Sequence, residues 1–351
     1  MQIKHLFSGV SFMKSTNTPQ ENIARLFFES IFWPNGPVCP YCKNTKSWTM
    51  HNRFGYYKCS SCRSQYTVRV GTILHGSHMS YQDWLLVIRL ICSAEKGIAA
   101  LQLKRLLSST YVTAWYMSHR VRCAMVTDFG ARKLQGIVEV DEIYLGNRKK
   151  QTKYYDESKI RKQRKSKKKS ETESLDTTTE NKPKKKRGRG TSKTPVLVLV
   201  ERGGQSIAVP MTRLNRTHLT KELLEHVALD ATIISDGYKG YCECEKIFAE
   251  HKKANHSQGL FDKEGEHVNT VESFNSLMRR GYYGVFHQYT DRHLHRYCVE
   301  MSFKRNHCKY KLDDKVELLI KKMRGRVMLY RHNNLILPVY AFKKVLVKNP
   351  M

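Results

Sequence analysis

The sequence lacks an apolar run of about 20 residues, the length that a membrane-spanning helix needs, which excludes a transmembrane protein. The first dozen residues have neither the length nor the cleavage site of a secretory signal. Acidic residues are scarce, because 31 Asp and Glu stand against 62 Lys and Arg and leave a formal net charge of +31. So large a positive charge is unusual for a cytosolic enzyme and favours nucleic acid or an anionic surface as the partner.

Ten cysteines are present, but only four of them follow a pattern. Cys39-x-x-Cys42 and Cys59-x-x-Cys62 are separated by 16 residues, so two tight turns can bring four thiolates to one structural Zn²⁺. Short segments with strand character between the pairs fit a zinc ribbon. Two disulfides or unpaired thiols are the alternative, which the missing secretory signal disfavours. The other six are expected to be buried small hydrophobes or incidental thiols: Cys92, Cys123, Cys242, Cys244, Cys298 and Cys308.

Composition divides the chain into four predicted regions. They are an N-terminal segment with the ribbon (1–75), a helical segment (76–130), an α/β domain (131–310) and a C-terminal helical tail (311–351). Within the third, residues 147–194 hold 19 basic and 6 acidic residues and almost nothing that could form a core, which predicts a disordered insert. Its run Lys182–Arg189 is similar to a nuclear localisation signal, although a solvated linker that touches DNA non-specifically is the commoner explanation.

Three helices are predicted before residue 130. Apolar residues recur every three or four positions over 80–94, a second helix spans 97–107, and a Ser-Ser-Thr turn precedes a third at 111–122. This pattern is typical of a helix-turn-helix whose third helix offers six residues to DNA: Thr113, Tyr116, Ser118, His119, Arg120 and Arg122. A plain helical bundle that links two domains is the alternative.

Three carboxylates stand out against this basic background. Asp141 closes the run Gly136-Ile-Val-Glu-Val-Asp141 and Asp236 closes Ala231-Thr-Ile-Ile-Ser-Asp236, so both are expected at strand ends. Glu272 lies early in a predicted basic helix. Carboxylate oxygens are the ligands that Mg²⁺ prefers. Phosphoryl transfer with two metal ions uses such acids to activate the attacking oxygen and stabilise the leaving one, and needs no histidine base or nucleophilic serine.

Each acid also has a structural explanation. Acids are common in turns at strand ends, and Asn269 with Glu272 has the spacing of a helix capping box. Helical spacing nevertheless places four residues on one polar face: Glu272, Asn275, Ser276 and Arg279. Arg279 would hold a DNA phosphate beside the metal. Glu139 and Glu142 are alternative ligands.

The strands around these acids predict an α/β fold with an RNase H-like mixed sheet. One strand spans 137–145, a hairpin joins 195–201 to 205–211 through a glycine turn, and a helix at 212–229 precedes a strand at 233–234. In such a core, carboxylates from two neighbouring strands and one helix converge on two metal ions. The zinc ribbon and the helical segment would precede this domain.

Seven ordered motifs follow the ribbon: Gly71–Ser77, Lys96–Leu103, Val138–Glu142, Arg187–Thr191, Val200–Gly204, Ser235–Tyr238 and His267–Glu272. Together they resemble DDE transposases of the insertion-sequence fifteen-ninety-five family, relatives of the eukaryotic Merlin elements, over about residues 20–310. The resemblance implies an enzyme that cleaves DNA at terminal inverted repeats and joins the freed ends to target DNA. Asp141, Asp236 and Glu272 would be catalytic, with Mg²⁺ or Mn²⁺ as cofactor. The chain departs from its relatives at Asn275, often tryptophan, and at Arg279, often lysine.

The resemblance also implies partners and further residues. Double-stranded DNA would be bound by a homo-oligomer away from membranes, in a bacterial cytoplasm with the nucleoid or in a eukaryotic nucleus. Arg279, Arg280, Lys304 and Arg305 would hold phosphates, and Tyr282, Tyr283, Phe286 and His287 would stack on a distorted end or pack in the core. Two rivals remain: a non-catalytic DNA-binding regulator derived from a transposase, and a metal-dependent nuclease or resolvase that cuts without joining.

Overall fold

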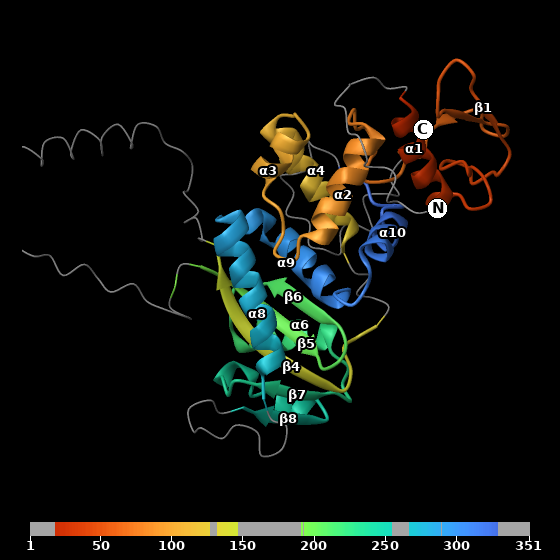
Figure 1. The fold of residues 1–351 in the computed structure, drawn as a ribbon. Coiled ribbons are helices and arrows are strands. Elements are labelled where there is room, and N and C mark those ends of the chain that lie inside the picture. The colour runs from red at the N-terminus through yellow and green to blue at the C-terminus, as the bar shows by residue number, and fades with distance from the viewer. Residues whose placement is uncertain are drawn as a thin grey trace, which may run out of the picture.

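The computed structural model describes residues 18–126, 132–146, 191, 193–254, 267–288 and 290–328. The predicted basic insert at 147–194 lies almost wholly outside these residues, except that Thr194 already belongs to a strand. A three-stranded ribbon, a group of helices and a five-stranded sheet covered by helices make up the fold (Figure 1). Within the described ranges, no helix is long and apolar enough to cross a membrane.

The ribbon is a small antiparallel sheet held against the first helix. Its strands are β1 (Ser47–Thr49), β2 (Tyr57–Cys59) and β3 (Gln65–Tyr66), in that order across the sheet. Helix α1 (Pro19–Phe32) begins after Thr18, whose side chain accepts a hydrogen bond from the backbone N–H of Glu21. The hydroxyl of Tyr57 donates to Glu29 of α1 at 2.9 Å, which fixes the ribbon to that helix.

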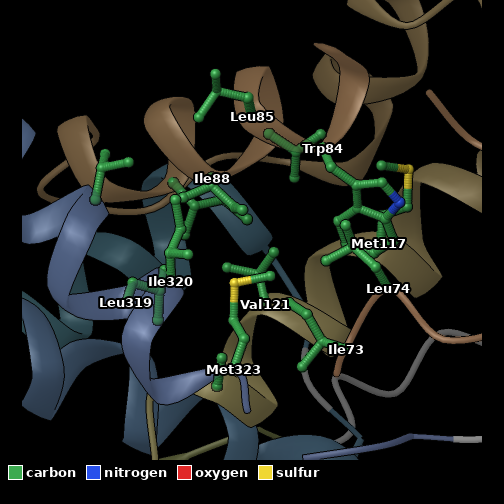
Figure 2. Packing of buried hydrophobic residues seen from close by; sticks show 14 of the residues in the cluster. Ile73, Leu74, Trp84, Leu85, Ile88, Met117, Val121, Leu319, Ile320 and Met323 are labelled. Carbon is green, nitrogen blue, oxygen red and sulfur yellow. The ribbon is translucent and has the colours of Figure 1, made fainter. Parts of the chain in front are cut away.

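The three predicted helices are present as α2 (Tyr81–Ser93), α3 (Ala100–Leu106) and α4 (Tyr111–Ala124). They share one apolar core with α1 and with α10 (Leu312–Lys322). Figure 2 shows side chains from these helices converging, among them Trp84, Ile88, Met117, Val121, Leu319 and Ile320. The predicted boundaries at 75 and 311 therefore separate elements that pack together.

The sheet has the order β6-β5-β4-β7-β8. Its strands are β4 (Ile137–Leu145), β5 (Thr194–Glu201), β6 (Ser206–Pro210), β7 (Thr232–Ser235) and β8 (Glu250–Lys253). The first three strands form an antiparallel meander, and β7 and β8 add in parallel on the other side of β4. This is the predicted RNase H-like mixed sheet. The edge strand β8 was not predicted, because its sequence is Glu-His-Lys-Lys and has no apolar alternation.

Helices cover both faces of the sheet. On one face lie α8 (Asn269–Gly281) and α9 (Asp291–Asn306), and on the other lie α6 (Arg216–His226), the 3₁₀ turn η3 (Lys239–Tyr241) and α7 (Cys244–Ile247). Helix α9 contributes Leu294 and Cys298 to the sheet core but Val299 and Phe303 to the helical core. It therefore joins the two halves of the molecule.

A buried ionic group links α4 to α9. The Nε of Arg122 lies 2.6 Å from one Glu300 carboxylate oxygen, and the Nζ of Lys304 lies 2.5 Å from the other. Burial alone would raise the pKa of Glu300, but the charges and hydrogen bonds of Lys304 and Arg122 lower it to about 2. The Glu300 carboxylate is therefore ionised in the folded protein at neutral pH.

The prediction that Arg120 and Arg122 contact DNA is wrong. Arg120 and Arg122 are buried, and Arg120 donates to the backbone oxygen of His75, so neither guanidinium is available to DNA. Ser118 and His119 are buried as well. Four of the six residues that this helix was predicted to offer to DNA are therefore buried, and only Thr113 and Tyr116 are partly exposed. The prediction failed because a basic residue on a helix was taken as exposed. Lys304 is likewise engaged inside the protein, with Glu300 and the backbone oxygen of Ala94.

Candidate active site

The pairing of two parallel strands brings the first two aspartates together. Val140 of β4 aligns with Ser235 of β7, so the next residues, Asp141 and Asp236, follow side by side. Carboxylate oxygens of Asp141, Asp236 and Glu142 lie within 4.8 Å of one another. Asp236 follows the end of its strand as predicted, but Asp141 lies inside β4, which continues to Leu145. Because β7 ends at Ser235, the part of β4 that begins with Asp141 is not paired with β7, and this edge of β4 is open.

Asp141 is held by two hydrogen bonds. Its Oδ1 accepts from the backbone N–H of Glu142 at 2.7 Å, and its Oδ2 accepts from the side-chain Nδ2 of Asn275 at 2.7 Å. Asn275 was predicted on a polar face of the helix, and it is only 1% exposed, because α8 lies directly over β4. Its Oδ1 has no hydrogen-bond partner in the part of the chain that the structure describes. A buried amide oxygen of this kind suits an oxygen-seeking cation better than an apolar core.

Several negative charges surround Asp141. Burial raises the pKa of its carboxyl group to about 6, and the charges of Glu142, Asp236 and Glu272 add to the rise. Crowded carboxylates repel one another unless a cation neutralises them. The donor set consists of hard oxygens without thiolate or imidazole, which fits Mg²⁺ or Mn²⁺.

Glu272 lies on the first turn of α8 with its side chain exposed. It stands outside the 4.8 Å group, although it is near enough for its charge to raise the pKa of Asp141. The capping box that competed with a metal role is not formed, because the N-cap of α8 is Val268 and makes no side-chain capping bond. Two acids therefore remain as candidates for the third metal ligand: Glu272 on the helix and Glu142 on the strand.

Glu139 was considered an alternative ligand, but it has another role. It is fully buried, and its Oε2 accepts from the backbone N–H groups of Thr270 and Val271 at 2.8 and 2.9 Å. Its Oε1 accepts from Nε of Arg202 at 2.7 Å. The carboxylate therefore caps the start of α8 from the strand that carries Asp141. Alternation along β4, which puts residues 139 and 141 on one face, was the signal that the prediction overlooked.

The four ribbon cysteines converge at the other end of the molecule. The sulfurs of Cys39 and Cys62 are 3.6 Å apart and those of Cys42 and Cys59 are 3.4 Å apart, and all four lie within 4.8 Å of one another. Four sulfurs around a tetrahedral Zn²⁺ with bonds of about 2.3 Å are separated by roughly 3.8 Å. All four thiols are free of disulfides. The cluster therefore fits a structural zinc ion.

Family models match the two regions of the chain that carry these residues. The ISXO2-like transposase domain matches residues 133–306, and the transposase zinc-ribbon domain matches residues 19–65. The chain carries an ISXO2-like transposase domain behind a transposase zinc ribbon. This confirms the predicted resemblance to insertion-sequence fifteen-ninety-five transposases with an N-terminal zinc ribbon. The first match contains all three predicted catalytic acids, and the second contains all four cysteines.

Two further proteins are similar to this chain with its ISXO2-like domain. An uncharacterized protein in transposable element ISH50 of Halobacterium salinarum is 24% identical over 264 residues, which cover 74% of this chain and 82% of that protein. Among solved structures, a pre-cleavage Mos1 transpososome shares 10% identity with a TM-score of 0.20, over 68% of this chain and 78% of that one. So low a TM-score carries no structural argument, and the fold assignment depends on the sheet topology and the family match.

On this transposase domain, several of the residues that were predicted to contact DNA are exposed at the end of α8. Arg279 and Arg280 are exposed in its last turn. Tyr283 is exposed beside Lys193, whose Nζ donates to the tyrosine hydroxyl at 2.9 Å. His287 is exposed too, whereas the remaining two aromatic candidates pack inward: Tyr282 and Phe286.

Proposed function

We propose that this protein is a DDE transposase that cleaves DNA at the terminal inverted repeats of an insertion sequence and joins the freed ends to target DNA. The observation that carries the proposal is the pairing of Asp141 with Asp236 at the open middle of β4, under the helix that bears Glu272. Membership of a transposase domain family supplies the reaction class. The oxygen donors suit two Mg²⁺ or Mn²⁺ ions.

Each residue of the site has a separate role in phosphoryl transfer. Asp141 and Asp236 would hold the divalent ions, which would supply activation of the attacking oxygen and stabilisation of the leaving oxygen. Asp141 and Asp236 supply carboxylate oxygens, and Asn275 fixes the orientation of Asp141. Glu139 holds α8 in place, so that Glu272 faces the same site. The exposed arginines at the end of α8 then neutralise backbone phosphates.

DNA is the partner that the charge favours. The chain carries 62 basic against 31 acidic residues, and the ribbon belongs to a transposase zinc-ribbon family. We expect a homo-oligomer in the DNA complex, because an insertion sequence has two ends that must be joined to one target.

Labelled inverted-repeat DNA and Mg²⁺ test the proposal directly. The full chain is expected to nick the strand at the end of the repeat and then to join the freed 3′ end to target DNA. Binding without a nick would support the DNA-binding regulator instead. Nicking that never leads to joining would support a nuclease. The repeats that flank the gene provide the probe, and an unrelated duplex of equal length is the control.

The third acid can be identified by a pair of variants. Glu272→Gln is expected to slow nicking by at least about 100-fold and to raise the Mg²⁺ concentration needed for half-maximal rate. Glu142→Gln is expected to stay within about tenfold of wild type, because the Glu142 carboxylate already accepts a bond from the buried Tyr241 hydroxyl at 2.7 Å. The reverse ranking would assign the third ligand to Glu142.

A further inference from the structure

The two faces of the ribbon sheet differ in what they present. Trp48 of β1 pairs with Lys58 of β2, and Lys58 pairs with Gln65 of β3, so these three side chains share one face. Residues on the opposite face pack against α1 and the cysteine cluster, among them Tyr57 and Tyr66. Trp48 is 51% exposed. The outer face therefore offers an indole ring to a partner.

Further aromatic and basic groups lie close to this outer face. Phe54 and Tyr56, in the turn between β1 and β2, are also exposed. Two exposed rings have an arginine guanidinium near them: Arg63 lies 5.6 Å from the centre of the Trp48 ring, and Arg53 lies 5.8 Å from that of Tyr56. Phe54 instead lies 4.7 Å from Arg25 of α1, which forms an ion pair with Glu29. An exposed ring can stack on a nucleobase, and a neighbouring cation can bind the phosphates that flank that base.

The charge of the segment points to the same partner. Between residues 30 and 82 the sequence contains no Asp or Glu. The ribbon itself carries five basic residues: Lys43, Lys46, Arg53, Lys58 and Arg63. Four thiolates with one Zn²⁺ offset only part of this charge. A polyanion is therefore the complementary partner.

We propose that the outer face of the ribbon binds an unpaired DNA strand, with Trp48 stacked on a base and the basic residues against the flanking phosphates. In a duplex, neighbouring bases cover both faces of each base, so an indole ring gains a stacking contact chiefly where a strand is unpaired. The inference rests on the proposed function in that DNA is the substrate. It adds that the ribbon acts where the transposon end is frayed or opened.

A binding assay with the full chain tests this surface in buffer without Mg²⁺. The probes are labelled oligothymidine and a labelled blunt duplex. Trp48→Ala is expected to weaken binding to the single strand by about 10- to 100-fold and binding to the duplex by less than about threefold. Trp48→Phe keeps a stacking ring and is expected to restore most of the affinity. Tyr310→Ala is the matched control, because Tyr310 is also 51% exposed and lies between α9 and α10.

Two results would overturn the inference. Equal weakening on both probes would make the ribbon a general contact for duplex phosphates, and no weakening on either would remove the face from DNA binding. The zinc content of each variant shows whether the ribbon is folded. Because no cleavage is needed, a protein that stacks on single strands but never nicks DNA would refute the transposase proposal and leave this inference standing.

Discussion

Asp236→Asn is expected to abolish strand cleavage while DNA binding stays within about twofold of wild type. The change keeps the shape of the side chain but removes one of the paired charges beside Asp141. A cation held by these oxygens loses a charged ligand, and we expect the nicking rate to fall by at least about 1000-fold. Affinity is expected to survive, because binding depends mainly on contacts between basic residues and phosphates. Nicking of a labelled strand and fluorescence anisotropy measure the two effects separately.

Asp230→Asn is the matched control for this variant. Asp230 is exposed just before β7, at the opposite end of the strand from Asp236. Its replacement removes the same charge near the other end of the same strand and is expected to leave nicking unchanged. Normal cleavage by Asp236→Asn would refute the metal-site assignment, whereas equal losses in both variants would point to net charge rather than to the site.

Local sequence patterns were sufficient to predict that Asp141 and Asp236 lie close together. Asp141 and Asp236 each follow a β-branched run, and parallel strands bring such positions to neighbouring places in a sheet. The strand over 137–145 was predicted with the bounds that the structure has, but the expectation that Asp141 closes a strand was wrong, because β4 continues through Glu142 to Leu145. In the structure, the Glu142 carboxylate accepts a hydrogen bond from the hydroxyl of Tyr241. Tyr241 lies 99 residues further along the chain, so no local pattern predicts this contact.

Helix α8 shows the same limit. Its helical spacing correctly grouped Glu272 with Asn275, but spacing alone does not tell which part of a polar face another element covers. Contact with β4 buries Asn275 and leaves Glu272 exposed. Whether Asn269 and Glu272 cap the helix also depended on a distant residue, because Glu139 takes over the backbone N–H groups at this end.

The buried ionic group is the strongest case of a distant partner, and it carries the second large prediction. Glu300→Gln is expected to lower the free energy of unfolding by about 3 to 5 kcal/mol, because it leaves the buried charges of Arg122 and Lys304 without their counter-ion. Urea unfolding near neutral pH measures the loss. Glu317→Gln is the matched control, since Glu317 and Lys321 form the same i,i+4 pair, 2.7 Å apart, on the surface of α10. We expect that variant to change stability by less than about 0.5 kcal/mol.

Acid should narrow the difference between wild type and Glu300→Gln. The folded pKa of Glu300 is about 2, below the 4.5 of a free glutamate, so the ionised group stabilises the fold fully above pH 4.5. As the pH falls from 4.5 toward 2, Glu300 of the unfolded chain takes up a proton before Glu300 of the folded protein does, so the stability that the charge contributes decreases and is lost as the pH passes the folded pKa of about 2. A stability difference that stayed constant over this range would mean that Glu300 contributes by its shape and hydrogen bonds. A difference that shrinks with acid would show that its charge holds α4 to α9, and through α9 holds the helical core to the sheet.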